Sequence, residues 1–354
     1  MKFKYIKEFS KMYDYFLFPR VYYSYNEQDD DQIFEEILDK EILNFYSNME
    51  HELAKYETEI NKYYQKGTYA EYEFINILLK AFPINDYKDE HQYLNYLKDI
   101  DDDVFKKGLI KAMFAIQDED FDQEVTESDA FNHINTLKLE SANKWNLFLM
   151  IQNPKEHLKG FTQLLTKIEH FYYDFYEKYD TKAEEVADRL IKRLSSQPNK
   201  EFSKITKNAI EFDFSGYDEC QVYISILFPF TMRFFNTDEC RFVWGIEMEQ
   251  AFNKVEEINE NKLIQRVKIF KALGDQTRYE TLRLLASGVT AVKDIASTLD
   301  VSSATISYHI NEFLTSGVII FSREKNKKVG YLIDYQRLEE VIDNLKKDLN
   351  FPEK

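Results

Sequence analysis

The chain has 354 residues, of which 44% are hydrophobic and 31% charged, and its formal net charge at pH 7 is −17. This length and composition allow two or three domains with sizeable cores and exclude wholesale disorder. The lysines near the amino terminus precede no apolar signal-peptide core. The most apolar stretch, residues 222–235, is too short to span a bilayer and contains Pro229 and Arg233. We therefore expect a cytoplasmic protein without membrane contact.

Cysteine, histidine and glycine usage gives no sign of a metal site or a nucleotide loop. Cys220 and Cys240 form no disulfide framework, and we interpret them as isolated core or strand residues in a reducing compartment rather than as a redox pair. The histidines of residues 1–250 lack metal-ligand spacing, and the five glycines there form no G-x-G-x-x-G loop and no P-loop. We expect no metal, no other cofactor and no enzymatic activity, although acid–base pairs among the many carboxylates stay open.

Charge divides the chain into two unequal parts. Residues 251–354 contain 16 basic and 15 acidic residues, whereas residues 1–250 contain 30 basic and 48 acidic ones, a net charge of −18. Such an asymmetry indicates separate domains with different partners. The sequence therefore predicts an acidic domain over residues 1–250 and a second domain over residues 251–354.

The first part reads mainly as helix. Apolar residues recur at three- and four-residue steps between residues 34 and 63, which predicts one long amphipathic helix that Gly67 can end. Asn153 as N-cap and Pro154 as first helical residue predict the start of another helix, and residues 181–196 predict a further one.

The period changes to two after residue 209. Apolar residues alternate with polar ones over residues 210–214, 222–226 and 242–248. Strict alternation is typical of strands with one buried face, so we expect a small antiparallel sheet near residues 209–249. The predicted fold class is mainly α with small β (α+β).

The second part begins with three short helical patterns. Residues 260–273 form the first, which Gly274 interrupts, and Asp275 can cap the second, which Gly288 ends. The third pattern covers residues 290–299 and is followed by the turn sequence "DVSS". A short helix and a tight turn of this kind commonly precede a recognition helix.

The next helix, residues 302–315, has one apolar side and one small-polar side. Ser302 is its natural N-cap. At 100° per residue, Ile306, Ile310, Phe313 and Leu314 point inward, Ala304, Thr305, Tyr308, Asn311 and Glu312 point outward, and Ser303 and His309 lie on the flanks. This is helix-turn-helix architecture, and the small outer residues allow the helix to enter the major groove of DNA.

A hairpin with a basic tip follows. Two apolar alternating runs within residues 318–333 flank the segment 323–328, which holds four basic residues and one acidic residue. We call this hairpin the wing. Its basic tip is suited to contact DNA phosphates, although a merely solvated hairpin is the alternative. A helix over residues 335–349 closes the domain.

The stretch "FKALGDQTRYETLRLLASG…VKDIASTLDVSSATISYHINEFLTSGVI…YLID" resembles the ArsR-type (arsenic-repressor-like) winged helix of bacterial transcription regulators, over about the last quarter of the chain. The resemblance implies a homodimer that binds operator DNA, usually as a repressor. With the residue patterns, it implies DNA contacts by Ser302, Ser303, Thr305, Ser307, Tyr308, His309, Arg323, Lys325, Lys327 and Lys328. By analogy the outer helices pair two subunits through Leu263, Val267, Phe270, Leu338, Val341, Ile342 and Leu345.

The resemblance leaves the signal and the role of residues 1–250 undetermined. The chain lacks the Cys pair and the acidic and His ligands of metal-sensing members, so we expect a non-metal signal. Residues 1–250 are expected to bind a small-molecule or peptide effector, to organise the dimer, or both. His309 is equally suited to DNA contact and to a surface hydrogen bond, whereas the outward Tyr308 favours function. The alternative is a protein-interaction or architectural module that keeps a winged-helix shape without sequence-specific DNA binding.

Overall fold

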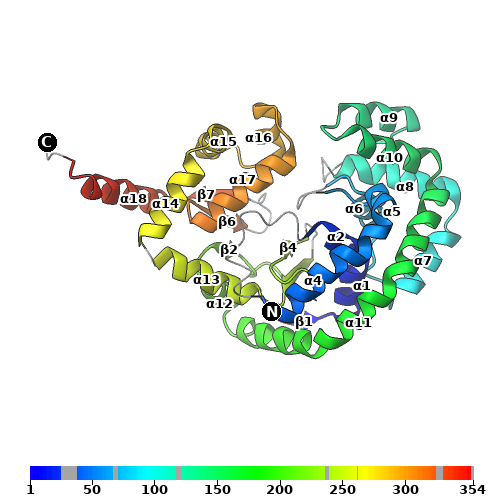
Figure 1. The fold of residues 1–354 in the computed structure, drawn as a ribbon, viewed down its shortest axis with the longest axis horizontal. Helices are drawn as coiled ribbons and strands as arrows, with labels where there is room; N and C mark the ends of the chain where they lie inside the picture. Colours follow the sequence, from blue (N-terminus) through cyan, green and yellow to red (C-terminus); the bar gives the residue numbers. More distant parts are fainter. Residues whose placement is uncertain are drawn as a thin grey trace.

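The structure is a computed structural model that describes residues 1–24, 38–66, 71–116, 121–235, 239–260, 262–323 and 330–351. It is mostly helical, and the long helix α11 forms the outer edge of its larger part (Figure 1). The helices of this part are α1 (Lys7–Leu17), α2 (Val21–Ser24), α4 (Lys40–Leu53), α5 (Glu57–Tyr63), α6 (Phe74–Ala81), α7 (Glu90–Asp99), α8 (Asp102–Ala115), α9 (Glu127–Thr136), α10 (Ser141–Gln152), α11 (Pro154–Leu194) and α12 (Pro198–Ile205).

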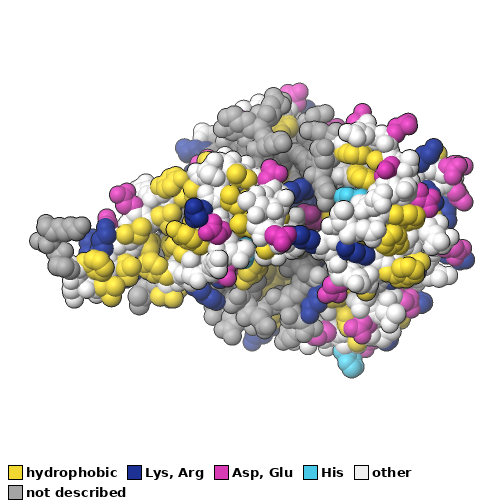
Figure 2. Space-filling view, turned by 90° about the horizontal axis from the view of Figure 1, so that it is seen from above, with side chains coloured by type: hydrophobic (Ala, Val, Ile, Leu, Met, Phe, Trp, Pro, Cys, Tyr) yellow, Lys and Arg dark blue, Asp and Glu magenta, His cyan; other side chains and the backbone are white. Residues whose placement is uncertain are grey.

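The remaining helices belong to the end of the chain. Helix α13 spans the boundary predicted at residue 250, and α18 projects away from the rest of the molecule toward the carboxyl terminus (Figure 1). The space-filling view shows hydrophobic side chains gathered over this projecting part (Figure 2). These helices are α13 (Met248–Glu260), α14 (Lys262–Leu273), α15 (Gln276–Ala286), α16 (Val292–Leu299), α17 (Ser303–Ser316) and α18 (Tyr335–Asp348).

Buried apolar residues form two separate clusters. The larger cluster lies among the first 252 residues and is rich in aromatic side chains, with Trp244, Tyr172 and Phe202 fully buried. The smaller cluster joins α14 to α18 and includes Ile306, Ile310 and Phe313 of α17. Two cores agree with two folding units, and the division at residues 250 and 251 stays a prediction. None of the described helices combines the length and apolar character that a membrane crossing requires.

The larger part contains a four-stranded sheet that is mixed rather than antiparallel. Its order is β1-β3-β5-β4, built from β1 (Lys2–Tyr5), β3 (Glu219–Ser225), β5 (Cys240–Gly245) and β4 (Met232–Phe234). The pairs β1–β3 and β3–β5 are parallel, and only β4–β5 is antiparallel. The predicted antiparallel sheet is therefore wrong in strand direction, although each predicted strand segment does contain a strand.

The error has a physical cause. Alternation identifies a strand and its buried face, whereas strand direction depends on the connections between strands. Residues 226–239 lie between β3 and β5, and parallel neighbours need a crossover of about a dozen residues or more, so this connection is long enough. Strand β1 comes from the other end of the chain and joins in parallel register, pairing Phe3 with Cys220.

A second sheet joins the two parts of the chain. Its order is β2-β6-β7, with β2 (Ile210–Phe212), β6 (Ile319–Arg323) and β7 (Gly330–Ile333). Strands β6 and β7 pair antiparallel where the wing hairpin is predicted. Strand β2 pairs in parallel with β6, so a strand predicted for the first domain's sheet instead extends the hairpin's sheet.

Two helix predictions differ from the structure in length. The pattern between residues 34 and 63 forms α4, a short 3-10 turn and α5 rather than one helix, and residues 34–37 lie outside the described part. Helix α11 begins at Pro154 with Asn153 as N-cap, as predicted. It continues without a break to Leu194, so the separate helix predicted over residues 181–196 is the end of α11.

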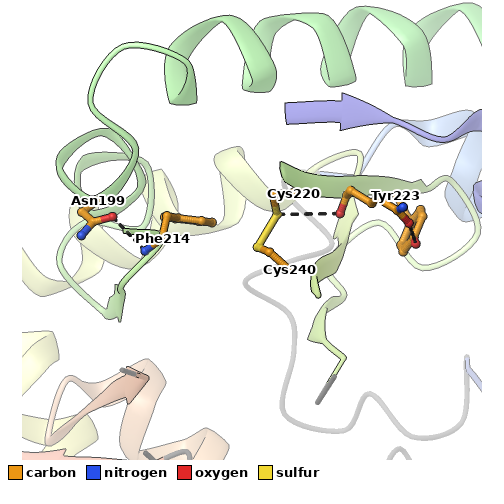
Figure 3. The surroundings of a disulfide bond; sticks show 6 residues. Asn199, Phe214, Cys220, Tyr223 and Cys240 are labelled. Carbon is orange, nitrogen blue, oxygen red and sulfur yellow. Dashed lines mark hydrogen bonds between the residues drawn. A yellow bond between two sulfur atoms is a disulfide. The ribbon is translucent and has the colours of Figure 1, made fainter. Parts of the chain in front are cut away.

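The two cysteines form a disulfide, contrary to their interpretation as isolated residues. Cys220 and Cys240 lie directly opposite each other on the paired strands β3 and β5, with their Cα atoms 4.5 Å apart (Figure 3). Both residues are buried. Sequence spacing could not indicate this pairing, because it depends on the register of two strands.

Candidate nucleic-acid interface

A tight turn joins α16 to α17. Asp300 ends α16 in the left-handed conformation, with φ 56°, and its N–H donates to the Ala296 carbonyl. Aspartate tolerates this backbone because its short polar side chain can bond locally. Ser302 then has extended backbone, and its Oγ accepts a hydrogen bond from the N–H of Thr305 at 3.0 Å. The turn and the cap therefore fix where α17 begins, as predicted.

The structure confirms which side of α17 points inward. Ile306, Ile310 and Phe313 are buried in the smaller core, and Leu314 packs against it partly buried. Because α14, α15 and α16 all contact α17, the helix is held on three sides. Packing against these helices therefore decides which side of α17 stays uncovered.

The side chains predicted to face DNA lie at or near the surface of α17, with one exception. Ser302, Ser303, Thr305 and Ser307 are half-buried, and Tyr308 is exposed. Hydroxyl groups in this position can donate to and accept from base edges. Nothing in the structure tests a DNA contact, so these residues keep their role as a prediction.

His309 is the exception, because it is only 7% exposed. Neither ring nitrogen makes a hydrogen bond within the described part of the chain. Burial lowers the pKa of His309, and the nearby Asp275 opposes this. The ring is therefore buried near the start of α15 rather than placed on the outer flank, and its contact with DNA stays a prediction.

An ion pair joins α15 to the outer side of α17. Arg278 Nη1 lies 3.4 Å from Glu312 Oε2, and both side chains are largely shielded from solvent. Asp275 caps α15 by accepting a hydrogen bond from the N–H of Arg278 at 2.8 Å. These contacts fix the angle between the two helices.

The wing follows a glycine that has little room for a side chain. Gly317 ends α17 with φ 72°, and a Cβ added there would meet Arg337 Nη1 at 2.5 Å. A left-handed residue lets the chain turn sharply from helix into strand β6. Lys325, Lys327 and Lys328 lie outside the described residues, and so does the side chain of Arg323.

The outer helices carry exposed apolar side chains. Val267, Phe270 and Ile342 are exposed, and Leu345 is half-buried. Val341 is instead buried in the smaller core, and Leu338 packs against that core. The side chain of Leu263 lies outside the described part. Of the residues predicted to pair two subunits, Val267, Phe270 and Ile342 are therefore exposed, and their role in a dimer stays a prediction.

A large cleft, which sequence reasoning missed, lies between the start of α17 and the helices α1 to α12, which we call the helical body. Its volume is about 1440 Å³. Ser302, Ser303 and Ala304 line one side, and Tyr64 and Tyr72 lie among the residues on the other. The lining segments are too far apart in sequence for any local pattern to indicate the cleft.

Charged side chains form contacts between the two sides of the cleft. Lys138, between α9 and α10, pairs with Asp300 in the turn before α17. Lys293, in the first turn of α16, donates to the carbonyl of Ile116 at the end of α8. Burial raises the pKa of Glu71, and the positive charge of Lys293 opposes that shift. Across the described residues no group of three or more His, Cys, Asp or Glu side chains is arranged to hold a metal ion.

Comparisons with known proteins point to the same segment. The family model of the arsR family of bacterial regulatory proteins matches residues 275–320. The chain is 35% identical over 82 residues to the uncharacterized HTH-type transcriptional regulator MJ1325 of Methanocaldococcus jannaschii, covering 23% of this chain and 91% of that protein. It is 33% identical over 75 residues to the transcriptional repressor SdpR of Bacillus subtilis, covering 21% of this chain and 82% of that protein.

A third relative is named for its link to cadmium. The chain is 31% identical over 77 residues to a cadmium resistance transcriptional regulatory protein CadC homolog of Staphylococcus aureus, covering 22% of this chain and 63% of that protein. No solved structure matches the chain at comparable significance.

Proposed function

The chain belongs, through its carboxy-terminal part, to the arsR family of bacterial regulatory proteins, which are DNA-binding transcription regulators, and we propose that it reads the major groove with α17. The arrangement of side chains on α17 supports this proposal. Ser302 caps its start, its apolar side is buried, and its hydroxyl-bearing side lies at the surface. A helix held in this way can place short polar side chains against base edges.

The wing, residues 318–333, supplies phosphate contacts in this proposal. Arg323, Lys325, Lys327 and Lys328 fall within six residues of the sequence, at the end of β6 and in the segment that connects β6 to β7. Phosphate contacts position a protein on DNA without reading its sequence. The wing therefore contributes affinity and salt dependence, while α17 contributes sequence preference.

We further propose that the protein acts as a homodimer, most simply as a repressor. Val267 and Phe270 of α14 and Ile342 of α18 are exposed apolar side chains, which a second copy can cover. A twofold dimer would present two copies of α17 to half-sites about one turn of DNA apart.

Residues 1–250 receive the signal or organise the dimer in this account. They are far more extensive than DNA binding requires, and their net charge of −18 repels a duplex. A ligand regulates DNA binding only through different affinities for the binding and non-binding states. The ligand that fits this role is a non-metal small molecule or peptide.

A mobility-shift scan of the full chain over the DNA upstream of its own gene tests the proposal. We expect a salt-sensitive shift with at least one fragment. Absence of any such shift with well-folded protein, together with a stable protein partner in pull-downs, would favour the alternative of an interaction module that keeps the winged-helix shape.

A further inference from the structure

We infer that the helical body holds α17 in an arrangement that excludes duplex DNA, and that the cleft must open before the protein can bind its operator. This inference rests on the proposed function of α17. It adds a regulatory device that the sequence does not reveal, namely a closed state stabilised by a few polar contacts between the body and the helix-turn-helix.

The position of the cleft is the first support. Ser302, Ser303 and Ala304 begin the helix that would enter the major groove, and all three line the cleft opposite the body. The cleft measures about 1440 Å³, which exceeds the usual range of small-molecule sites, about 300–1,000 Å³. Because a recognition helix contacts several base pairs of a duplex, this space is too small for its target.

The second support is the position of the two polar contacts between the helical body and the helix-turn-helix. Lys293 lies in the first turn of α16, and Asp300 directly follows its last residue. Lys293 bonds to the Ile116 carbonyl, and Asp300 pairs with Lys138. The body therefore holds both ends of the helix that positions α17, so α17 cannot turn outward while the two contacts persist.

The third support is the contrast with the opposite side of the molecule. There β2 pairs with β6 along its length, and Phe234 stacks on Phe321 with ring centroids 6.2 Å apart. Strands β2 and β6 are paired through their backbones at three positions, whereas the pair of Lys138 with Asp300 is exposed, and exposed ion pairs contribute little. The cleft side therefore gives way first, and the strand-paired side serves as the hinge. Two states separated by so small a difference can be shifted by a ligand or by DNA itself.

Charge reversal at Lys138 tests this inference, because simple charge effects and cleft opening predict opposite results. Lys138→Glu makes the acidic body more negative, which by itself weakens DNA binding. It also breaks the pair with Asp300 and repels it, which opens the cleft. We expect the full-length variant to bind an operator fragment about two- to fivefold more tightly than wild type, the range that corresponds to an exposed ion pair.

Lys111→Glu is the matched control. Lys111 pairs with Asp122 at the surface of the body, and its side chain is 51% exposed against 49% for Lys138. The same charge is added, but no contact with the helix-turn-helix changes. We expect this variant to bind DNA no more tightly than wild type.

A covalent lock supplies the second arm. Lys138→Cys and Asp300→Cys, combined in the full chain, can be joined by a short bismaleimide, because Cys220 and Cys240 are already bonded to each other. The cross-linked protein should bind DNA about tenfold more weakly or worse, within the range of typical coupling between two states. Each variant that carries only one of the two introduced cysteines, treated with the same reagent, should bind DNA like its untreated form.

The outcomes separate this inference from the proposed function. If wild type binds DNA, but the cross-linked protein binds as tightly and Lys138→Glu binds no more tightly than Lys111→Glu, the closed-state inference is overturned while the proposed function stands. If wild type and all variants fail to bind DNA, the proposed function is overturned, and the inference falls with it.

Discussion

Ser302 Oγ accepts a hydrogen bond from the backbone N–H of Thr305 and lies 2.8 Å from the Thr305 hydroxyl. These two side chains therefore hold the first turn of α17 together, and Ser302 also lines the cleft. Helix capping and the proposed DNA contact are combined in the same residues. Substitutions there need a control that separates stability from binding.

Ser302→Ala tests the cap. Loss of the side-chain acceptor leaves the N–H of Thr305 without its partner, and the free energy of unfolding should fall by about 1 kcal/mol. Ser302→Asp restores the acceptor and the stability, but it adds a negative charge where a phosphate or base would lie, so DNA affinity should fall. Urea denaturation and DNA titration of both variants measure the two effects. Unchanged stability in Ser302→Ala would show that the cap is unimportant.

The wing and α17 should contribute in different ways. Lys327→Ala or Lys328→Ala should weaken binding to every DNA sequence alike and reduce the slope of log affinity against log salt by about one unit or less. Substitutions of Thr305 or Tyr308 should instead change which operator variants are preferred. Titrations on a panel of operator variants at several salt concentrations distinguish these results. Identical behaviour of wing and helix variants would contradict the assignment.

The proposed dimer surface can be tested with two matched valines. Val267 on α14 is 60% exposed and lies on the proposed interface, whereas Val104 on α8 is 56% exposed and lies on the body. Val267→Glu should place a charge in the apolar contact and convert the dimer into monomers, because an unpaired buried charge is costly. Val104→Glu should leave the dimer intact. Sedimentation measurements over a range of concentrations decide, and a dimer that survives Val267→Glu would contradict the proposed surface.

Acid should destabilise the protein through His157. Its ring is buried between Tyr63 and Phe74, and burial, with a smaller contribution from Lys62, lowers its pKa from 6.5 to about 3. Between these two pH values the unfolded chain binds the proton and the folded chain does not. The stabilisation is therefore complete above about pH 6.5 and is lost as the pH falls toward 3.

The size of this effect can be isolated with a variant. When the pH falls from 7 to 5, the free energy of unfolding of wild type should drop by about 2 kcal/mol more than that of His157→Phe. The reason is that one pH unit corresponds to about 1.4 kcal/mol for a single proton. The exposed His170→Phe is the control and should behave like wild type. Urea denaturation at both pH values measures the difference, and equal losses in wild type and His157→Phe would contradict the account.

Local patterns were enough to predict the helix-turn-helix. The cap at Ser302, the buried residues Ile306, Ile310 and Phe313, and the turn after α16 all depend on residues within one or two helical turns. Helical periodicity and capping chemistry act over this range, so a single sequence is informative there. The burial of His309 was missed because it depends on how α15 packs against α17.

Long-range relationships were not predictable in the same way. The parallel pairing of β2 with β6, the disulfide between Cys220 and Cys240, and the contact of Lys138 with Asp300 each join segments that no local period relates. Alternation predicts that a strand exists but not its neighbour, and an exposed lysine carries no mark of its partner. The cleft, which is built from such relationships, could therefore be found only in the folded chain.

The most direct test of the central claim is the ratio of specific to non-specific DNA affinity, measured by competition mobility shift at one physiological salt concentration. The account predicts a fragment that the full chain binds about 10³-fold or more tightly than unrelated DNA, as is typical of specific regulators. Its protected region should contain two half-sites about one helical turn apart. Equal affinity for all fragments of the same length would contradict sequence-specific reading by α17.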